Sequence, residues 1–239
     1  MMQISIERND RMYTVTVGKQ PIVTLWAWWD QEVKEFIRQV RRIHGKRNTQ
    51  DLIVGLWADH SANYSGGYSY YYDSKRGGGK IRPLEVMALC VGHHCLLIEL
   101  QGGCSEGKVL RERKVLRDFL FDRQTVVVGV GTERLAKKLE EEYGILIPRR
   151  VELLGLAQAD RGLKQEDGNS LNLSRCSLGE LARVVLGEEV NYVRPTKIRW
   201  RENQFNWGPF SNDLVKCSTA EAFLAAQMGA KLLKNGPRT

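Results

Sequence analysis

The stretch TVVVGV at residues 125–130, followed by TERLAKKLEEEYG at residues 132–144, decides the class of fold. A continuous run of β-branched residues, with no polar residue alternating in it, is typical of a strand that is covered on both faces. The segment after it has apolar residues at helical spacing, and Gly144 marks its end. A buried strand followed directly by a helix indicates an α/β domain.

The segments upstream of this stretch are mostly strand-like, and those downstream are mostly helical. Alternation of apolar and polar residues predicts strands, spacing of three and four predicts helices, and Gly, Pro and Asn clusters predict the turns between them. These patterns predict a hairpin at residues 12–25, strands at 51–57, 86–92 and 95–100, and helices at 26–43, 109–120, 153–163, 177–186 and about 218–235. The order predicts a mixed sheet that is covered by helices.

The composition is that of an ordinary folded protein. Of 239 residues, 36 are Lys or Arg and 28 are Asp or Glu, which gives a formal charge of +8, and 42% are hydrophobic. These values exclude a disordered or collagen-like chain. We expect a single domain over residues 1–239, with an N-terminal hairpin and helix at about 12–45, a sheet core at about 50–150 and C-terminal helices at about 153–235.

No apolar run is long enough to cross a bilayer, and residues 1–11 lack the apolar core of a signal peptide. The sequence therefore predicts a cytoplasmic or nuclear protein without a membrane partner. The five cysteines are an odd number without CxxC spacing, which argues against a disulfide framework and against a zinc site. The adjacent pair His93 and His94 falls in a predicted turn with no third ligand evident, so we interpret it as an exposed turn.

Six segments in the same order resemble one family of nucleases. They are LIVGL at 52–56, ALCVGHHCLLIEL at 88–100, LRDFL at 116–120, VVGVG at 127–131, SLGELARVVLG at 177–187 and AFLAAQMGAKL at 222–232. Together they resemble the 3′-5′ exonuclease domain of the RNase D and Werner-syndrome type, especially its plant branch. The resemblance covers nearly the whole chain and implies the DEDD exonuclease fold, which is ribonuclease H-like with a mixed five-stranded sheet flanked by helices.

The same resemblance implies where a catalytic site would lie. Members of this family bind two metal ions through four carboxylates, and a Tyr four residues before the last Asp orients the attacking water. Two divalent ions about 4 Å apart require several hard oxygen ligands, because the ions repel each other. The first two acidic positions fall here on Trp57 and Asp59, the third on Leu135, the Tyr on Cys217 and the last Asp on Glu221.

These residues predict a degenerate site. Trp57 and Leu135 cannot bind a metal, and Cys217 lacks the phenol of the family Tyr. We therefore expect a catalytically degenerate exonuclease-like protein, without a cofactor, that acts by binding a protein partner, nucleic acid or both. The alternative is an active metal-dependent 3′-5′ exonuclease on DNA or RNA ends, with Mg²⁺ or Mn²⁺ held in an unconventional site by Asp59 and Glu221.

Two sets of residues are candidates for binding. Basic residues with aromatic neighbours suit phosphates and stacked bases, and tyrosines in a glycine-rich segment suit a protein partner. The candidates for nucleic acid are Lys75, Arg76, Lys80, Arg82, Arg199 and Trp200, and those for a partner are Tyr68, Tyr70, Tyr71 and Tyr72. A second copy of the chain is a further candidate partner, and a solvated basic surface remains the alternative interpretation of the positive charge.

Overall fold

The structure is a computed structural model. It describes residues 2–44, 51–59, 84–100, 114–160, 173, 176–187, 190, 192–195, 198 and 210–235. No helix among these residues is both long and apolar enough to span a bilayer. Candidate binding residues Lys75, Arg76, Lys80, Arg82, Arg199, Trp200, Tyr68, Tyr70, Tyr71 and Tyr72 lie outside the described residues.

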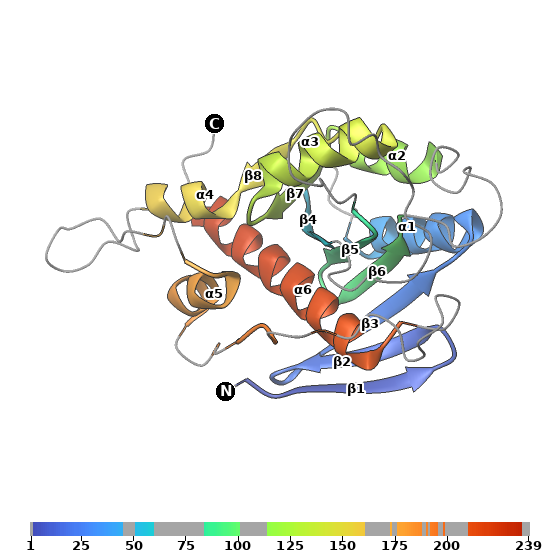
Figure 1. Ribbon diagram of the computed structural model, residues 1–239. Helices are drawn as coiled ribbons and strands as arrows, with labels where there is room; N and C mark the ends of the chain where they lie inside the picture. The colour runs from blue at the N-terminus through green and yellow to red at the C-terminus, as the bar shows by residue number, and fades with distance from the viewer. Residues whose placement is uncertain are drawn as a thin grey trace, which may run out of the picture.

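A single mixed sheet is the centre of the described structure (Figure 1). Its strands are β1 (Ile4–Asn9), β2 (Met12–Val17), β3 (Gln20–Ala27), β4 (Leu52–Asp59), β5 (Val86–Val91), β6 (His94–Glu99), β7 (Thr125–Gly129) and β8 (Arg150–Glu152). The helices are α1 (Asp30–His44), α2 (Lys114–Phe121), α3 (Thr132–Tyr143), α4 (Leu153–Ala159), α5 (Leu178–Leu186) and α6 (Asn212–Asn235). The strand order is β1-β2-β3-β6-β5-β4-β7-β8.

The part β6-β5-β4-β7-β8 matches the five-stranded mixed sheet that the family resemblance implied, although the sequence patterns did not predict β8. Strands β6, β5 and β4 pair antiparallel, and β4, β7 and β8 pair parallel. The expected count of five is nevertheless too low for the whole sheet, which has eight strands. The difference arises because β3 pairs parallel with β6, from Val23 opposite His94 to Ala27 opposite Ile98, so the N-terminal strands extend the same sheet. The α/β, ribonuclease H-like class is confirmed by this arrangement.

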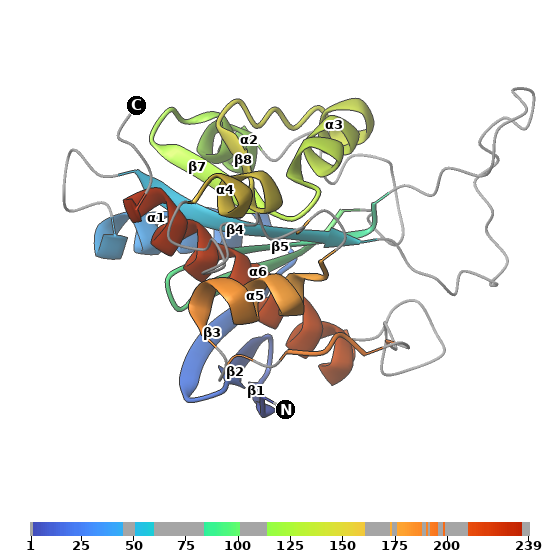
Figure 2. The same cartoon turned by 90° about the vertical axis from the view of Figure 1, so that its left-hand side faces the viewer.

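Helices cover both faces of the sheet. Helices α4, α5 and α6 pack into one hydrophobic cluster, and α1, α2 and α3 pack into a second one. Figure 2 shows α5 and α6 on one side of the sheet and α2 and α3 on the other. The strands of the centre are buried on both faces, as the apolar run at residues 125–130 predicted.

Three helices differ from their predicted bounds for local reasons. The helix predicted at 153–163 ends at Ala159, because the backbone of Asp160 is extended (φ −71°, ψ 114°). The helix predicted at 26–43 begins at Asp30, because residues 26 and 27 still belong to β3. The carboxylate of Glu32 then accepts hydrogen bonds from the backbone N–H groups of Trp28 (2.8 Å) and Trp29 (3.0 Å). The last helix begins at Asn212 and not near residue 218, because the hydroxyl of Ser211 caps it by accepting from the N–H of Leu214 (3.1 Å).

Helix α6 lies directly on β4 at Gly55. A Cβ atom at Gly55 would lie 1.9 Å from the carbonyl oxygen of Ala222 and 2.7 Å from the backbone nitrogen of Ala226. Both contacts are with backbone, which cannot move aside as a flexible side chain can. The absence of a side chain at Gly55 therefore sets the separation between helix and strand.

We expect Gly55→Ala to lower the free energy of unfolding by about 3 kcal/mol, because the added methyl forces α6 away from β4. Gly155→Ala in α4 is the matched control: a Cβ there would meet nothing within 4 Å, so replacement of a helical glycine should raise stability by about 0.5–1 kcal/mol. Urea denaturation of both variants measures the difference. Equal stability of the two would contradict the close approach at Gly55.

Candidate functional site

The end of β4 that faces α6 holds two of the predicted site residues. Alternate residues of a strand share a face, so Gly55, Trp57 and Asp59 all point to the same side of the sheet. Gly55 contacts Ala222 of α6. Glu221 is the residue before Ala222, and Cys217 lies one helical turn before Glu221, so both lie beside the end of β4. Trp57 is 5% exposed and Glu221 is also 5% exposed, so an indole and a carboxylate share one buried region.

A third element, residues 192–195, completes this region. The phenol of Tyr192 donates to Oε1 of Glu221 (2.9 Å) and lies 3.3 Å from Sγ of Cys217. The thiol of Cys217 in turn lies 3.5 Å from the same carboxylate oxygen. A phenol is thus present next to the position of the family Tyr, but it comes from a different part of the chain.

Helix α5 supports this segment through another close backbone contact. A Cβ atom at Gly179 would lie 2.0 Å from the carbonyl oxygen of Tyr192. The helix itself begins with a capping box, in which Ser177 and Glu180 exchange hydrogen bonds, as the sequence pattern predicts. The start of α5 is therefore fixed locally, and Gly179 allows the backbone at Tyr192 to lie against it.

Arg194, two residues after Tyr192, joins the two acidic residues of the site. Its Nη2 atom forms a short ion pair with Oδ2 of Asp59, and its Nη1 atom lies 3.6 Å from Oε2 of Glu221. Its guanidinium carbon also stands 6.0 Å from the centre of the Trp57 ring. Asp59 and Glu221 therefore share one cation that belongs to the protein itself.

Burial governs the protonation of the other groups in this region. Burial raises the pKa of Glu221, although Arg194 and hydrogen bonds from Tyr192, Cys217 and Trp57 oppose that rise. Burial and the nearby Glu221 carboxylate raise the pKa of Cys217 to about 12 and raise that of Tyr192 well above its usual range. Burial by itself would lower the pKa of Arg194, but the attraction of Glu221 and the other acids outweighs it and the pKa is raised.

Leu135 lies apart from this group. It is on α3 and packs, half-buried, with the hydrophobic cluster that includes α1 and α2. Trp57 belongs to the cluster on the other face, together with α6. The structure therefore brings together four of the five predicted site positions, Trp57, Asp59, Cys217 and Glu221, and places the fifth with a different set of neighbours.

The residues in this region do not fit the pair of divalent ions that the family resemblance implies. No group of three or more His, Cys, Asp or Glu side chains suited to a metal occurs in the described part of the chain. The two carboxylates that do meet, Asp59 and Glu221, already have the Arg194 guanidinium between them. A cationic side chain at this point repels a divalent ion instead of ligating it.

Sequence reasoning missed Tyr192 and Arg194. Neither falls in a periodic segment or a recognisable motif, since the residues around them, EEVNYVRPTK at 188–197, read as a connection after α5. The one signal is that the family resemblance places two acids, Asp59 and Glu221, in the same site, where a basic residue is a favourable neighbour. Which of the 36 Lys and Arg residues supplies it could not be read from the sequence.

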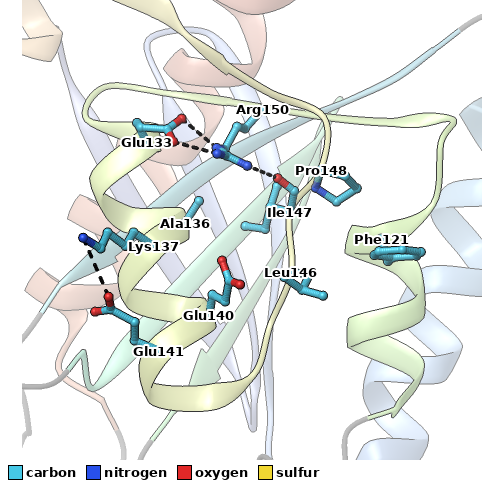
Figure 3. Close-up of a pocket in the computed structure, with 10 residues that line it drawn as sticks. All are labelled: Phe121, Glu133, Ala136, Lys137, Glu140, Glu141, Leu146, Ile147, Pro148 and Arg150. Carbon is cyan, nitrogen blue, oxygen red and sulfur yellow. Dashed lines mark hydrogen bonds and ion pairs between the residues drawn. The ribbon is translucent and has the colours of Figure 1, made fainter.

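A surface groove of about 590 Å³ lies elsewhere, between α3, the end of α2 and residues 145–150 (Figure 3). Phe121, Leu146 and Pro148 form its apolar part, and the ion pair of Arg150 with Glu133 (2.6 Å) lies on its α3 side. The groove is lined by elements of the opposite face of the sheet from α6, and it shares no residue with the Arg194 region.

Solved structures match the chain at low identity and with low TM-scores. The crystal structure of the EXD2 exonuclease domain soaked in Mn and GMP matches with 18% identity and a TM-score of 0.40, over 89% of this chain and 90% of that one. The same domain soaked in Mg matches with 19% identity and a TM-score of 0.41, over 88% and 89%. No protein-family model matches the sequence, and the search of curated proteins finds no match. The assignment of the fold depends on strand order and direction.

Because its pKa is raised and its side chain is 2% exposed, Cys217 should not react as a nucleophile. We expect iodoacetamide at pH 8 to label the half-buried Cys176 in the native protein and to leave Cys217 unlabelled until the chain is unfolded in urea. Peptide mass spectrometry reads each cysteine separately. Equal labelling of Cys217 and Cys176 in the native state would contradict the buried site.

The raised pKa of Glu221 predicts a pH dependence of stability. As pH rises through 4.5, the ordinary value, the unfolded chain loses this proton before the folded one does, which favours unfolding. Stability of the wild type relative to Glu221→Gln should therefore fall from about pH 4.5 until the folded group has also ionised. Denaturant curves at a series of pH values measure this difference. A stability difference between wild type and Glu221→Gln that stays constant above pH 4.5 would show that burial does not raise the pKa of Glu221.

Proposed function

We propose that this protein is a catalytically degenerate relative of the RNase D and Werner-syndrome type of 3′-5′ exonuclease, close to its plant branch, and that it acts by binding and not by cleaving. The single observation that carries the proposal is the placement of Trp57. Its indole is buried against α6, at the position where the family resemblance implies the first metal-binding carboxylate.

The remaining site residues support the same proposal. Tyr192 donates a hydrogen bond to Oε1 of Glu221, the thiol of Cys217 lies 3.5 Å from the same oxygen, and Arg194 lies 3.6 Å from Oε2. Asp59 is held by Arg194. Catalysis by two metal ions needs carboxylate oxygens that are free to bind them. In this site the oxygens are committed to side chains of the same chain.

For the binding role, we propose a protein partner, nucleic acid or both. The formal charge of +8 supports attraction to phosphates. Several described basic residues, however, already pair with acids: Arg41 with Asp122 at 2.7 Å and Arg149 with Asp51 at 2.6 Å. The residues proposed to contact phosphates are Lys75, Arg76, Lys80, Arg82 and Arg199.

A nuclease time course tests this proposal. Labelled single-stranded and recessed-end DNA and RNA are incubated with wild-type protein in Mg²⁺ and in Mn²⁺, with Asp59→Ala purified in parallel. We expect no degradation by the wild type above the level of Asp59→Ala, because Asp59 serves here as an ion-pair partner and not as a metal ligand. Degradation by the wild type that Asp59→Ala abolishes would establish the alternative, an active exonuclease with an unconventional metal site.

A binding measurement separates the two kinds of partner. Fluorescence anisotropy with single-stranded DNA and RNA at increasing salt should show affinity that falls steeply with salt if phosphates are contacted. The charge-removing variant Lys75→Gln/Arg76→Gln is compared with Arg149→Gln, whose side chain already pairs with Asp51. If both variants and the wild type bind DNA and RNA with equal affinity, the result would favour a protein partner over nucleic acid.

A further inference from the structure

The guanidinium of Arg194 occupies a defined place between carboxylates of two different elements. One of its terminal nitrogens contacts Asp59 at the end of β4, and the other lies 3.6 Å from Glu221 on α6. We propose that Arg194 is a built-in cation, which holds these two acids together in place of divalent metal ions and excludes such ions from this region. This inference rests on the proposed function and states how the former site is closed.

The charges favour this assignment. Two ionised carboxylates bring two negative charges to one partly buried region, and Glu221 is 5% exposed. Buried charge of one sign is unfavourable unless a partner of the other sign is close. Within the described residues, Arg194 is a cation that contacts both Asp59 and Glu221. The attraction of these acids raises the pKa of Arg194. The charge of the Arg194 guanidinium is permanent, so this cation is present beside both acids at every physiological pH.

The geometry of guanidinium suits this place better than ammonium would. The group is planar and directs its nitrogens in a fork, so one side chain can contact two separate carboxylates. The lysine ammonium is a compact point charge without that fork. Arg194 uses separate nitrogens for Asp59 and Glu221, which ties strand β4 to helix α6 through residues 192–195.

Trp57 and Arg194 are complementary. The indole stands where the resemblance implies a carboxylate, and the guanidinium carbon lies 6.0 Å from its ring centre. An aromatic face attracts a cation, whereas it provides no ligand for a divalent metal. The same indole is buried in the region that holds Glu221 and opposes the rise that burial causes in the pKa of that carboxyl, so Trp57 lies beside both members of the Arg194–Glu221 pair. The substitution that removes a metal ligand thus also stabilises the cation that replaces the metal.

Removal of the positive charge tests this inference. Arg194→Met keeps most of the side-chain volume but leaves Asp59 and Glu221 without their cation, and Arg194→Lys is the control that keeps the charge. We expect the affinity of Arg194→Met for Mn²⁺ to exceed that of wild type by about tenfold or more. The substitution removes the positive charge that repels a divalent ion from the two carboxylates. Isothermal titration with Mn²⁺ and the loss of free-Mn²⁺ electron paramagnetic resonance signal measure binding.

Two further variants test whether the bound Mn²⁺ lies at the position of Arg194. Arg194→Lys should bind Mn²⁺ no better than wild type, and Arg194→Met/Asp59→Asn should lose the binding that Arg194→Met gains. Mn²⁺ binding that is the same in wild type and Arg194→Met, or that survives Asp59→Asn, would overturn the inference. If Arg194→Met is insoluble, its refolding yield with and without Mn²⁺ gives the answer: a higher yield with Mn²⁺ supports the inference, and equal yields overturn it.

The experiment distinguishes failure of this inference from failure of the proposed function. Nuclease activity of the wild type that depends on Asp59 would contradict the proposed function itself. An inactive wild type together with an Arg194→Met variant that gains no Mn²⁺ binding would contradict only the role of Arg194. We expect Arg194→Met to remain inactive as a nuclease, since Trp57 and Leu135 still provide no ligand.

Discussion

The contact between α6 and β4 at Gly55 is the constraint on which the rest of the structure depends. Because Gly55 has no side chain, the backbone of α6 at Ala222 and Ala226 lies directly against the central strand. That single approach brings Glu221 to Trp57 and positions the α6 turn that carries Cys217. Any residue larger than glycine would separate the two elements that form the site.

Close backbone contacts recur where other elements join this centre. Gly179 allows Tyr192 to lie against α5, and Tyr192 then reaches Glu221 with its phenol. Arg194 follows in the same segment and pairs with both acids. The arrangement converts a region where carboxylates would repel each other into one that is held together by hydrogen bonds, ion pairs and an aromatic face.

Much of the fold could be predicted from local patterns. The buried strand at β7, the helix α3 that ends at Gly144 and the capping box of α5 each depend on residues within a few positions of one another. The eight-stranded extent of the sheet could not be predicted in this way. It depends on parallel pairing between β3 and β6, which are separated by more than sixty residues, and such pairing leaves no mark in either segment.

The sequence by itself determined the class of the fold and the absence of a metal-binding side chain at Trp57 and Leu135, because side-chain chemistry is a local property and an indole or a leucine cannot bind a divalent ion wherever it lies. Only the tertiary structure decided which side chains lie beside Trp57. Arg194 is one of 36 basic residues, and its role follows from its position between Asp59 and Glu221, 135 and 27 residues away along the chain. Ion pairs over such separations exist only once helix, strand and connecting segment have packed together.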